Sequence, residues 1–524
     1  MRRRARSASP APPERRRAQK KPIPLSPLVG HSSFGLRTIL IETVVFIVWI
    51  VLLTVNAILL VLRPLLRQLD ACMGAAPTEA GPRRVVIVGA SFAGLAAQRE
   101  LSGRRDVTVT LVDFKSYFEY TPGILRCFVK PDFLGELTCA LPSSRNELIL
   151  GAMTRADAEG VVIRDVQGAV RTVPYDYLVL AVGSTYADPI KPLESEPTLR
   201  ARAASWEQAA AKLAAASTVI IVGAGPVGVE LAGEILTVFP QKRVTFVDMA
   251  RTILPGFSGS AASYTKAWFA ARGAEMRLGE AIDQISSNSL LLKSGELLEA
   301  DVVYKCVRMM PPHGDPSPFS HAPLLLFAAL HPSPFTPLSS SAYLPASASL
   351  SPSPRCVGVM PNTAMLKGSS IFASSFGFRD SIEVNDYLQL ARHPNVYCVG
   401  DMMVHASREL KLGHTAEVNA HLAAHNIIAD IHGEPLLAYP HGVTGADTTP
   451  KIWCLSLGRY YAVVGFNGLV LCGWYVAVLK WLLEWTKVAA AGEQPVGILF
   501  WKVADTTSNW LHRTLLRPRK AHAA

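Results

Sequence analysis

VVIVGASFAG, residues 85–94, is a short apolar run that enters a glycine turn, and VIIVGAGPVG repeats it at residues 219–228. Each copy is followed by a helix-like stretch and then by a second apolar run that ends in an acid, Asp113 in the first case and Asp248 in the second. A strand, a glycine turn, a helix and an acid about twenty residues further on form a dinucleotide-binding βαβ unit. The repetition therefore predicts two dinucleotide sites in one chain.

Small residues occupy the three spaced positions that this Rossmann fingerprint requires. The first glycine permits the tight turn, the second lets the backbone approach a pyrophosphate, and the third lets the helix pack closely on its strand. The helix N-terminus offers unpaired N–H groups to the phosphates. The first copy has Gly89, Ser91 and Gly94 at these positions, and the second has Gly223, Gly225 and Gly228. Ser91 is small and adds a hydroxyl donor, so both copies are predicted to bind a cofactor.

The two strand-end acids predict how the nucleotides are held. Asp113 and Asp248 lie where a carboxylate accepts hydrogen bonds from ribose hydroxyls. A carboxylate at Asp248 disfavours a 2′-phosphate, so NADH is the expected coenzyme, while Arg251, three residues on, keeps NADPH as the alternative. The simpler reading of either acid is that it merely ends a strand.

The predicted fold class is α/β, with two Rossmann-like domains that each contain a doubly wound, mostly parallel sheet. A C-terminal region and an N-terminal hydrophobic helix are expected beside them. The predicted segments are a basic tail (1–35), a transmembrane helix (36–66), a first nucleotide-binding domain (83–188 and 358–438), a second one (189–302), an insertion (308–357) and the C-terminal region (439–524).

The insertion has a composition unlike that of the rest of the chain. Residues 308–357 hold eleven prolines and ten serines among fifty residues, without a helical or strand period. Such a segment buries too little apolar surface to offset its ordering entropy. The flanking residues read as one continuous strand and turn if they are joined. We infer an in-frame insertion, either an unspliced intron in the gene model or a genuine disordered loop.

The positive charge of the chain is concentrated at its N-terminus. The net charge is +11, but residues 1–21 alone hold nine Arg or Lys against one acid. The remainder is nearly neutral, which argues against a nucleic-acid partner. The tail is also rich in Ser, Pro and Ala, so a mitochondrial or chloroplast transit peptide and a disordered basic arm are the two alternatives.

A hydrophobic stretch follows the tail. Residues 43–62 contain no charge, and twenty residues at about 1.5 Å each just span a hydrocarbon core of roughly 30 Å. We therefore expect membrane association. If the tail is cleaved, the flanking arginines favour a catalytic side facing the NAD(P)H-containing compartment; if it is retained, its charges favour the opposite orientation.

A third element assigns the two nucleotides. Residues 395–401 (NVYCVGD) are an apolar strand that delivers Asp401 at its end, and a helix-like stretch follows at 411–428. This strand–Gly–Asp pattern resembles the second FAD contact of two-dinucleotide flavoproteins of the pyridine nucleotide-disulfide oxidoreductase type. The resemblance implies that Asp401 binds the ribityl chain, that the first fingerprint holds FAD and that the second holds NAD(P)H.

Two further segments narrow the resemblance. Residues 113–123 (DFKSYFEYTPG) resemble the segment that meets the isoalloxazine ring in the type II NADH dehydrogenase superfamily, which implies that Thr121 and Pro122 contact FAD. Residues 411–417 (KLGHTAE) and 456–459 (SLGR) are similar to the apoptosis-inducing-factor-homologous, ferroptosis-suppressor branch. The similarity covers roughly 83–307 and 358–470. His414 and Val418 stand where the bacterial dehydrogenases carry two glutamines, which weakens any transfer of their quinone site.

The resemblance implies an FAD-dependent NAD(P)H oxidoreductase that passes electrons to a quinone. Lys411 matches a lysine of that branch near the flavin and is a candidate for stabilising negative charge, and His414 is a candidate proton source. A surface histidine is the simpler reading of His414. The eight cysteines form no C-x-x-C pair and no metal-ligand spacing, so no metal is expected.

The acceptor is inferred from the predicted membrane location. Residues 468–485 are apolar and rich in tryptophan, with two charges, Lys480 and Glu484, which favours an interfacial membrane helix over a core helix. The expected partners are a quinone or other small acceptor, membrane lipid and a second copy of the chain in a homodimer. A reductase of a soluble acceptor and a slow-turnover redox-signalling flavoprotein are the alternative functions.

Overall fold

The computed structural model describes most of the chain from residue 81 to residue 514. The described residues are 81–142, 147–186, 188–306, 308–309, 356–357, 360–407, 409, 411–439 and 452–514, with Val51, Thr54 and Ile58. The predicted basic tail, nearly all of the predicted transmembrane helix and most of the predicted insertion lie outside these residues. Within the described residues, no helix has the length and apolar character needed to cross a membrane.

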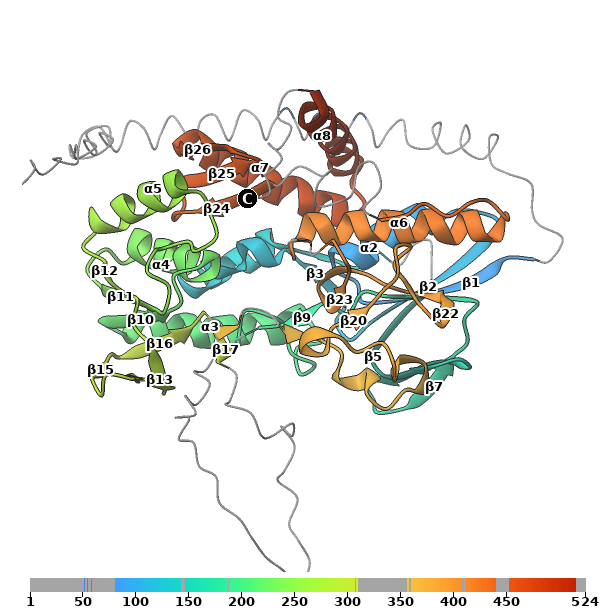
Figure 1. Cartoon of the computed structure of the whole chain (residues 1–524), viewed down its shortest axis with the longest axis horizontal. Helices are drawn as coiled ribbons and strands as arrows, with labels where there is room; N and C mark the ends of the chain where they lie inside the picture. Colours follow the sequence, from blue (N-terminus) through green and yellow to red (C-terminus); the bar gives the residue numbers. More distant parts are fainter. Residues whose placement is uncertain are drawn as a thin grey trace, which may run out of the picture. The chain divides into compact units, whose positions relative to one another are not determined.

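A large sheet contains the first fingerprint (Figure 1). Its strand order is β21-β22-β8-β1-β2-β5-β6-β7, and the five strands from β22 to β5 run parallel. Their bounds are β1 (Arg83–Val88), β2 (Val107–Asp113), β5 (Glu147–Asp157), β6 (Gly160–Asp165), β7 (Val170–Val173), β8 (Tyr177–Leu180), β21 (Gln389–Leu390) and β22 (His393–Cys398). β8 is buried along its whole length, and its sequence is a continuous apolar run, as expected for a parallel strand that is covered on both faces. The α/β class is confirmed.

A smaller, wholly parallel sheet contains the second fingerprint. Its order is β12-β11-β10-β16. The strands are β10 (Thr218–Val222), β11 (Arg243–Asp248), β12 (Glu275–Leu278) and β16 (Val302–Lys305). The accompanying elements are α3 (Leu199–Ala215), α4 (Pro226–Val238), α5 (Gly259–Ala270) and the antiparallel strands β13 (Ile282–Ile285), β14 (Ser289–Leu292) and β15 (Leu297–Glu299).

The two ends of the predicted insertion lie side by side. β17 (Arg308–Met309) pairs antiparallel with β18 (Cys356–Val357). The chain thus leaves and returns at one point, as the continuity of the flanking sequence predicts. It then pairs β19 (Met360–Pro361) with β9 (Ser184–Thr185) and adds β22 to the large sheet. The origin of the insertion stays a prediction.

We call the part built on the large sheet the first half and the part built on the smaller sheet the second half. Short elements and one long helix complete the first half. The helices α2 (Phe92–Leu101) and α6 (Gly413–Ile431) lie side by side although they are far apart in sequence (Figure 1). The short elements are β3 (Tyr117–Glu119), β4 (Thr138–Ala140), η1 (Thr121–Phe128), η2 (Pro131–Glu136), η3 (Ala364–Leu366), η4 (Ser370–Phe372), η5 (Phe378–Asp380), η6 (Gly400–Met402), β20 (Ile382–Glu383) and β23 (Met403–Val404).

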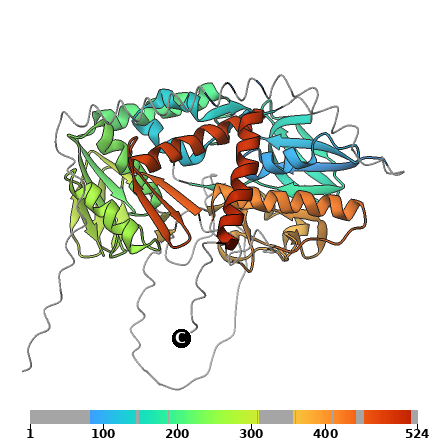
Figure 2. The ribbon, with the colours of Figure 1, turned by 90° about the horizontal axis from the view of Figure 1, so that it is seen from above.

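The C-terminal region forms a three-stranded sheet followed by two helices. The strands β24 (Ile452–Ser456), β25 (Ala462–Phe466) and β26 (Leu469–Gly473) are antiparallel, and α7 (Trp474–Ala491) packs against α8 (Pro495–Thr514) (Figure 2). The prediction of one interfacial helix over 468–485 is therefore partly wrong, because its first residues pair as β26 with β25. Alternating exposed positions in β26 give it a strand period that its apolar composition hides.

Candidate functional site

The first glycine turn admits no side chain at two of its positions. Gly89 follows β1 with φ +104°, and a Cβ there would lie 2.3 Å from the Ala181 carbonyl oxygen. A Cβ at Gly94 would lie 1.6 Å from the Gly89 carbonyl oxygen. Because α2 begins directly after the turn, the N–H groups of its first turn lie at the carboxyl end of the sheet. Ser91 is the N-cap of α2, and its hydroxyl makes no capping hydrogen bond.

Asp113 ends β2 beside this turn. Its Oδ2 accepts hydrogen bonds from Ala90 N at 2.5 Å and from Lys115 Nζ at 3.1 Å, and its Oδ1 accepts one from Lys115 N at 3.0 Å. Both side chains of the ion pair are almost fully buried. Lys115 is not among the residues predicted from the sequence, although an acid followed two residues later by a lysine in an apolar context is a visible signal.

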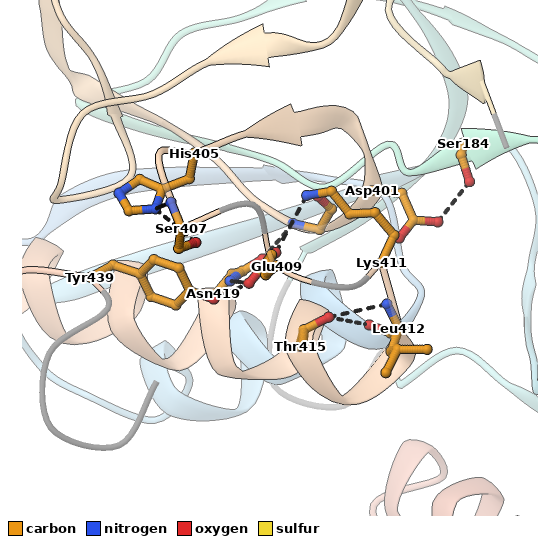
Figure 3. Close-up of polar contacts among 11 residues, drawn as sticks. Ser184, Asp401, His405, Ser407, Glu409, Lys411, Leu412, Thr415, Asn419 and Tyr439 are labelled. Carbon is orange, nitrogen blue, oxygen red and sulfur yellow. Dashed lines mark hydrogen bonds and ion pairs between the residues drawn. The ribbon is translucent and has the colours of Figure 1, made fainter. Parts of the chain in front are cut away.

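The chain that returns as β22 completes the same edge of the sheet. Ser184 Oγ, just after β8, donates a hydrogen bond to Asp401 Oδ2 at 2.7 Å (Figure 3). Gly400 has φ +75°, and a Cβ there would lie 3.5 Å from the Ala416 Cβ and 3.8 Å from the Ala93 Cβ. Gly400 therefore lies between the first turns of α2 and α6. Two helix N-termini converge where Asp401 is presented.

The predicted ring-facing segment lies at the same place. Phe92, the first residue of α2, stacks edge-on against Tyr120 with ring centroids 5.9 Å apart. Tyr120 precedes Thr121 and Pro122, which begin η1. A Cβ at Gly413, the first residue of α6, would lie 3.1 Å from the Phe92 ring. The structure thus brings the predicted FAD residues together, although their contacts with FAD stay predictions.

Lys411 approaches this edge from the loop before α6. Its Nζ donates hydrogen bonds to the Gly400 carbonyl oxygen at 3.2 Å and to Glu409 Oε1 at 3.3 Å (Figure 3). The Glu409 side chain is buried, and burial raises its pKa. His414 lies in the first turn of α6 and is half-buried. Lys411 and His414 were predicted from the sequence, whereas Glu409 was not.

The second glycine turn repeats the first, except that its middle position is Gly225 where the first turn has Ser91. A Cβ at Gly228 would lie 1.9 Å from the Gly223 carbonyl oxygen, so this position also requires glycine for packing. A Cβ at Gly225 would meet no protein atom within 4 Å. The space in front of Gly225 is where a pyrophosphate approaches the backbone, so the turn fits a dinucleotide. Asp248 accepts hydrogen bonds from Ala224 N at 2.6 Å and from Ala250 N at 2.7 Å.

A buried charged cluster, which was not predicted from the sequence, joins the C-terminal region to both halves. Glu230 Oε1, in α4, accepts hydrogen bonds from Lys480 Nζ at 2.8 Å, from Ser456 N at 2.8 Å and from Ser456 Oγ at 3.0 Å. Arg126 of η1 lies 3.2 Å from Glu234 and 3.5 Å from Glu484. Lys480 and Glu484 of α7 therefore face inward rather than toward water.

Sequence comparison matches part of the chain to a known protein family. Residues 83–311 match the family described as pyridine nucleotide-disulphide oxidoreductase. The chain is accordingly a flavin-dependent NAD(P)H oxidoreductase, with FAD and NAD(P)H as its cofactors. Within this class it is similar to the ferroptosis-suppressor and type II NADH dehydrogenase proteins.

Three relatives illustrate that similarity. Ferroptosis suppressor protein 1 of Homo sapiens is 24% identical over 400 residues, which cover 74% of this chain and 90% of the relative. The type II NADH:quinone oxidoreductase Ndh of Mycobacterium tuberculosis is 28% identical over 258 residues, which cover 42% and 56%. The structure of NDH2 from Plasmodium falciparum in complex with NADH matches with a TM-score of 0.55 at 12% identity, covering 83% of this chain and 99% of that one. The last likeness concerns the fold.

Proposed function

We propose that the chain takes a hydride from NADH in its second half and passes the electrons through FAD in its first half to a membrane quinone. The observation that carries the proposal is the edge of the large sheet, where two helix N-termini meet Ser184, Asp401 and Asp113. A quinone as the acceptor is supported by the Mycobacterium tuberculosis relative, which is an NADH:quinone oxidoreductase.

In the first half, each group has a defined task toward the cofactor. The N–H groups at the starts of α2 and α6 would hold the pyrophosphate, with Gly89 and Gly94 keeping the helix close. Asp113 would accept hydrogen bonds from the ribose, and Asp401 from the ribityl chain. When bound, the flavin supplies two-electron uptake from a nicotinamide and electron release to an acceptor.

In the second half, the glycine turn and Asp248 would hold NADH. Gly223 and Gly228 let α4 begin against β10, and Gly225 leaves room for the pyrophosphate. A ribose diol satisfies the Asp248 carboxylate, whereas a 2′-phosphate would be repelled by it. NADH is therefore the proposed coenzyme. Arg251 is exposed nearby and is the residue that would admit NADPH.

Two side chains are proposed to act during acceptor reduction. Lys411 holds a positive charge at the Gly400–Asp401 edge, where it would stabilise negative charge that develops on the cofactor. His414, in the first turn of α6, would supply a proton to the acceptor. The role of Lys411 follows from the resemblance, whereas that of His414 follows from the chemistry of an imidazole.

The C-terminal region supports a membrane as the source of the acceptor. Lys480 and Glu484 are buried on the inner side of α7, whereas Trp474 and Tyr475 at its start are exposed. Other exposed apolar side chains in this region are Leu469, Leu471, Leu479, Ile498, Leu499 and Val503. An apolar outer side with tryptophan and tyrosine suits the lipid–water interface. We therefore propose membrane lipid as a partner.

An acceptor panel tests the proposal against the two alternatives. NADH oxidation would be measured with a short-chain ubiquinone, with ferricyanide and with ascorbyl radical, using both membranes and purified protein. Fast quinone turnover that falls when residues 465–524 are deleted supports the proposal. A matched variant with Trp474→Ser and Leu479→Ser separates loss of membrane contact from loss of fold. Turnover with soluble acceptors alone, or with none, overturns it.

A further inference from the structure

Gly400, the residue before Asp401, is one member of a closed ring of hydrogen bonds. The other members are Glu409, Lys411 and Asn419 (Figure 3). The Gly400 carbonyl oxygen accepts from Lys411 Nζ at 3.2 Å, and the same Nζ donates to Glu409 Oε1 at 3.3 Å. Asn419 Nδ2 donates to Glu409 Oε2 at 3.2 Å, and Asn419 Oδ1 accepts from Gly400 N at 3.1 Å. Glu409 thus links the strand end, the loop and α6 in one network.

Glu409 is the most enclosed charged member of this ring. Its side chain is 5% exposed, against 26% for Lys411. Tyr439, buried after α6, donates its hydroxyl to the same Glu409 oxygen that Asn419 contacts. A buried carboxyl group is costly unless donors surround it, and the three donors around Glu409 offset that cost.

Lys411 depends on this arrangement for its position. A lysine ammonium on a flexible four-carbon stem is strongly hydrated and extends toward water when no partner holds it. Asn419 and Tyr439 fix one oxygen of Glu409, which leaves the other directed at Lys411. The Gly400 carbonyl alone offers one acceptor for a group with three donors.

We propose that Glu409 is a positioning residue, which holds the Lys411 ammonium at the Gly400–Asp401 edge and so keeps its positive charge beside the flavin site. The inference rests on the proposed function in assigning FAD to this edge. It makes no demand on the identity of the electron acceptor, because Glu409 acts through Lys411 and not on substrate.

Potentiometric titration of the FAD-loaded full-length protein tests the coupling without using NADH or quinone. A cation beside the flavin favours its reduction, so Lys411→Met is expected to lower the midpoint potential. Glu409→Leu removes the group that holds Lys411 and is expected to lower it as well. The double variant is expected to match Lys411→Met alone, since both changes remove one interaction. The FAD dissociation constant, measured in parallel, is expected to be non-additive in the same way.

Two outcomes would overturn the inference. One is a Glu409→Leu shift that persists undiminished in the Lys411→Met background, and the other is no shift in Glu409→Leu when Lys411→Met gives one. If Glu409→Leu does not fold, Glu409→Gln replaces it: its shift must disappear in the Lys411→Met background. Glu417→Gln, a buried carboxylate on the same helix that pairs with Lys487, is the matched control and should leave the potential unchanged. Failure of the proposed function would show instead as absence of NADH:quinone turnover.

Discussion

The two glycine turns share a motif but differ in their surroundings. Asp113 is buried and paired with Lys115, whereas Asp248 is half-buried and accepts two backbone N–H groups. The first turn is completed by β22 and α6 from later in the chain, whereas the second lies in a sheet of four local strands. An enclosed site suits a cofactor that stays bound, and a more open one suits a coenzyme that must exchange at every turnover.

The largest expected effect comes from the packing glycine of each turn. Gly94→Ala places a Cβ 1.6 Å from a backbone oxygen, so α2 must move away from β1. Overpacking typically costs about 1–3 kcal/mol, and a clash with backbone belongs at the upper end of that range. We expect Gly94→Ala protein to lose FAD during purification, as measured by flavin absorbance per protein. Gly228→Ala should retain FAD and lose NADH binding; equal FAD loss in both variants would contradict the assignment of the two halves.

Gly225→Ala separates ligand contact from packing in the second turn. A Cβ at Gly225 meets no protein atom within 4 Å, so the fold should tolerate it. We expect an unchanged Tm and FAD content, with the KM for NADH raised about tenfold because the methyl group occupies the space proposed for the pyrophosphate. An unchanged KM would place the dinucleotide elsewhere.

Substitution of Asp248 and substitution of Asp113 should affect the binding of different cofactors. Asp248→Ala removes a carboxylate that accepts two backbone N–H groups, and loss of hydrogen bonds to a charged group costs about 1.5–3 kcal/mol. We expect a higher KM for NADH. We also expect a smaller preference for NADH over NADPH, measured as the ratio of the two kcat/KM values. Asp113→Ala should instead lower FAD affinity, measured by equilibrium dialysis. Reversal of these outcomes would exchange the assignments of the halves.

A smaller effect is expected at Lys411. Lys411→Met removes the ammonium at the Gly400 carbonyl, and we expect kcat with a short-chain ubiquinone to fall about tenfold, the loss of one charged hydrogen bond. The KM for NADH should change less than about twofold, because NADH is assigned to the other half. Lys411→Arg serves as the control that keeps the charge. Unchanged turnover would remove Lys411 from the mechanism.

The smallest effect concerns how α7 holds α6. Burial alone would raise the pKa of Glu417, but Lys487 and Arg99 outweigh it and lower that pKa. A lowered folded-state pKa gives stability that is complete above the unfolded value of about 4.3 and is lost as the pH falls through the folded value. The difference in unfolding free energy between wild type and Glu417→Gln should therefore be constant above about pH 5 and shrink in acid. A difference that grows in acid would contradict this ion pair.

The fold and the two glycine turns could be predicted from the sequence because their signals are local. Gly89, Gly94, Gly223 and Gly228 stand in fixed spacing, and Asp401 follows a recognisable strand. The orientation of Lys480 and Glu484 was predicted wrongly. Two charges in an apolar helix suggested a water-facing side, but both side chains are buried against η1 and α4. Glu409 escaped notice because its partners Asn419 and Tyr439 lie on α6 and beyond it. Such contacts between distant segments have no period or spacing in the sequence.

We propose that electrons enter at the second turn and leave through the first. Anaerobic stopped-flow mixing of the FAD-loaded protein with NADH, followed by a second mix with short-chain ubiquinone, tests this path. We expect rapid bleaching of the flavin absorbance by NADH, slow bleaching in Gly225→Ala, and recovery of the absorbance when quinone is added. Bound FAD that NADH fails to bleach, or bleaching that Gly225→Ala leaves unchanged, would contradict it.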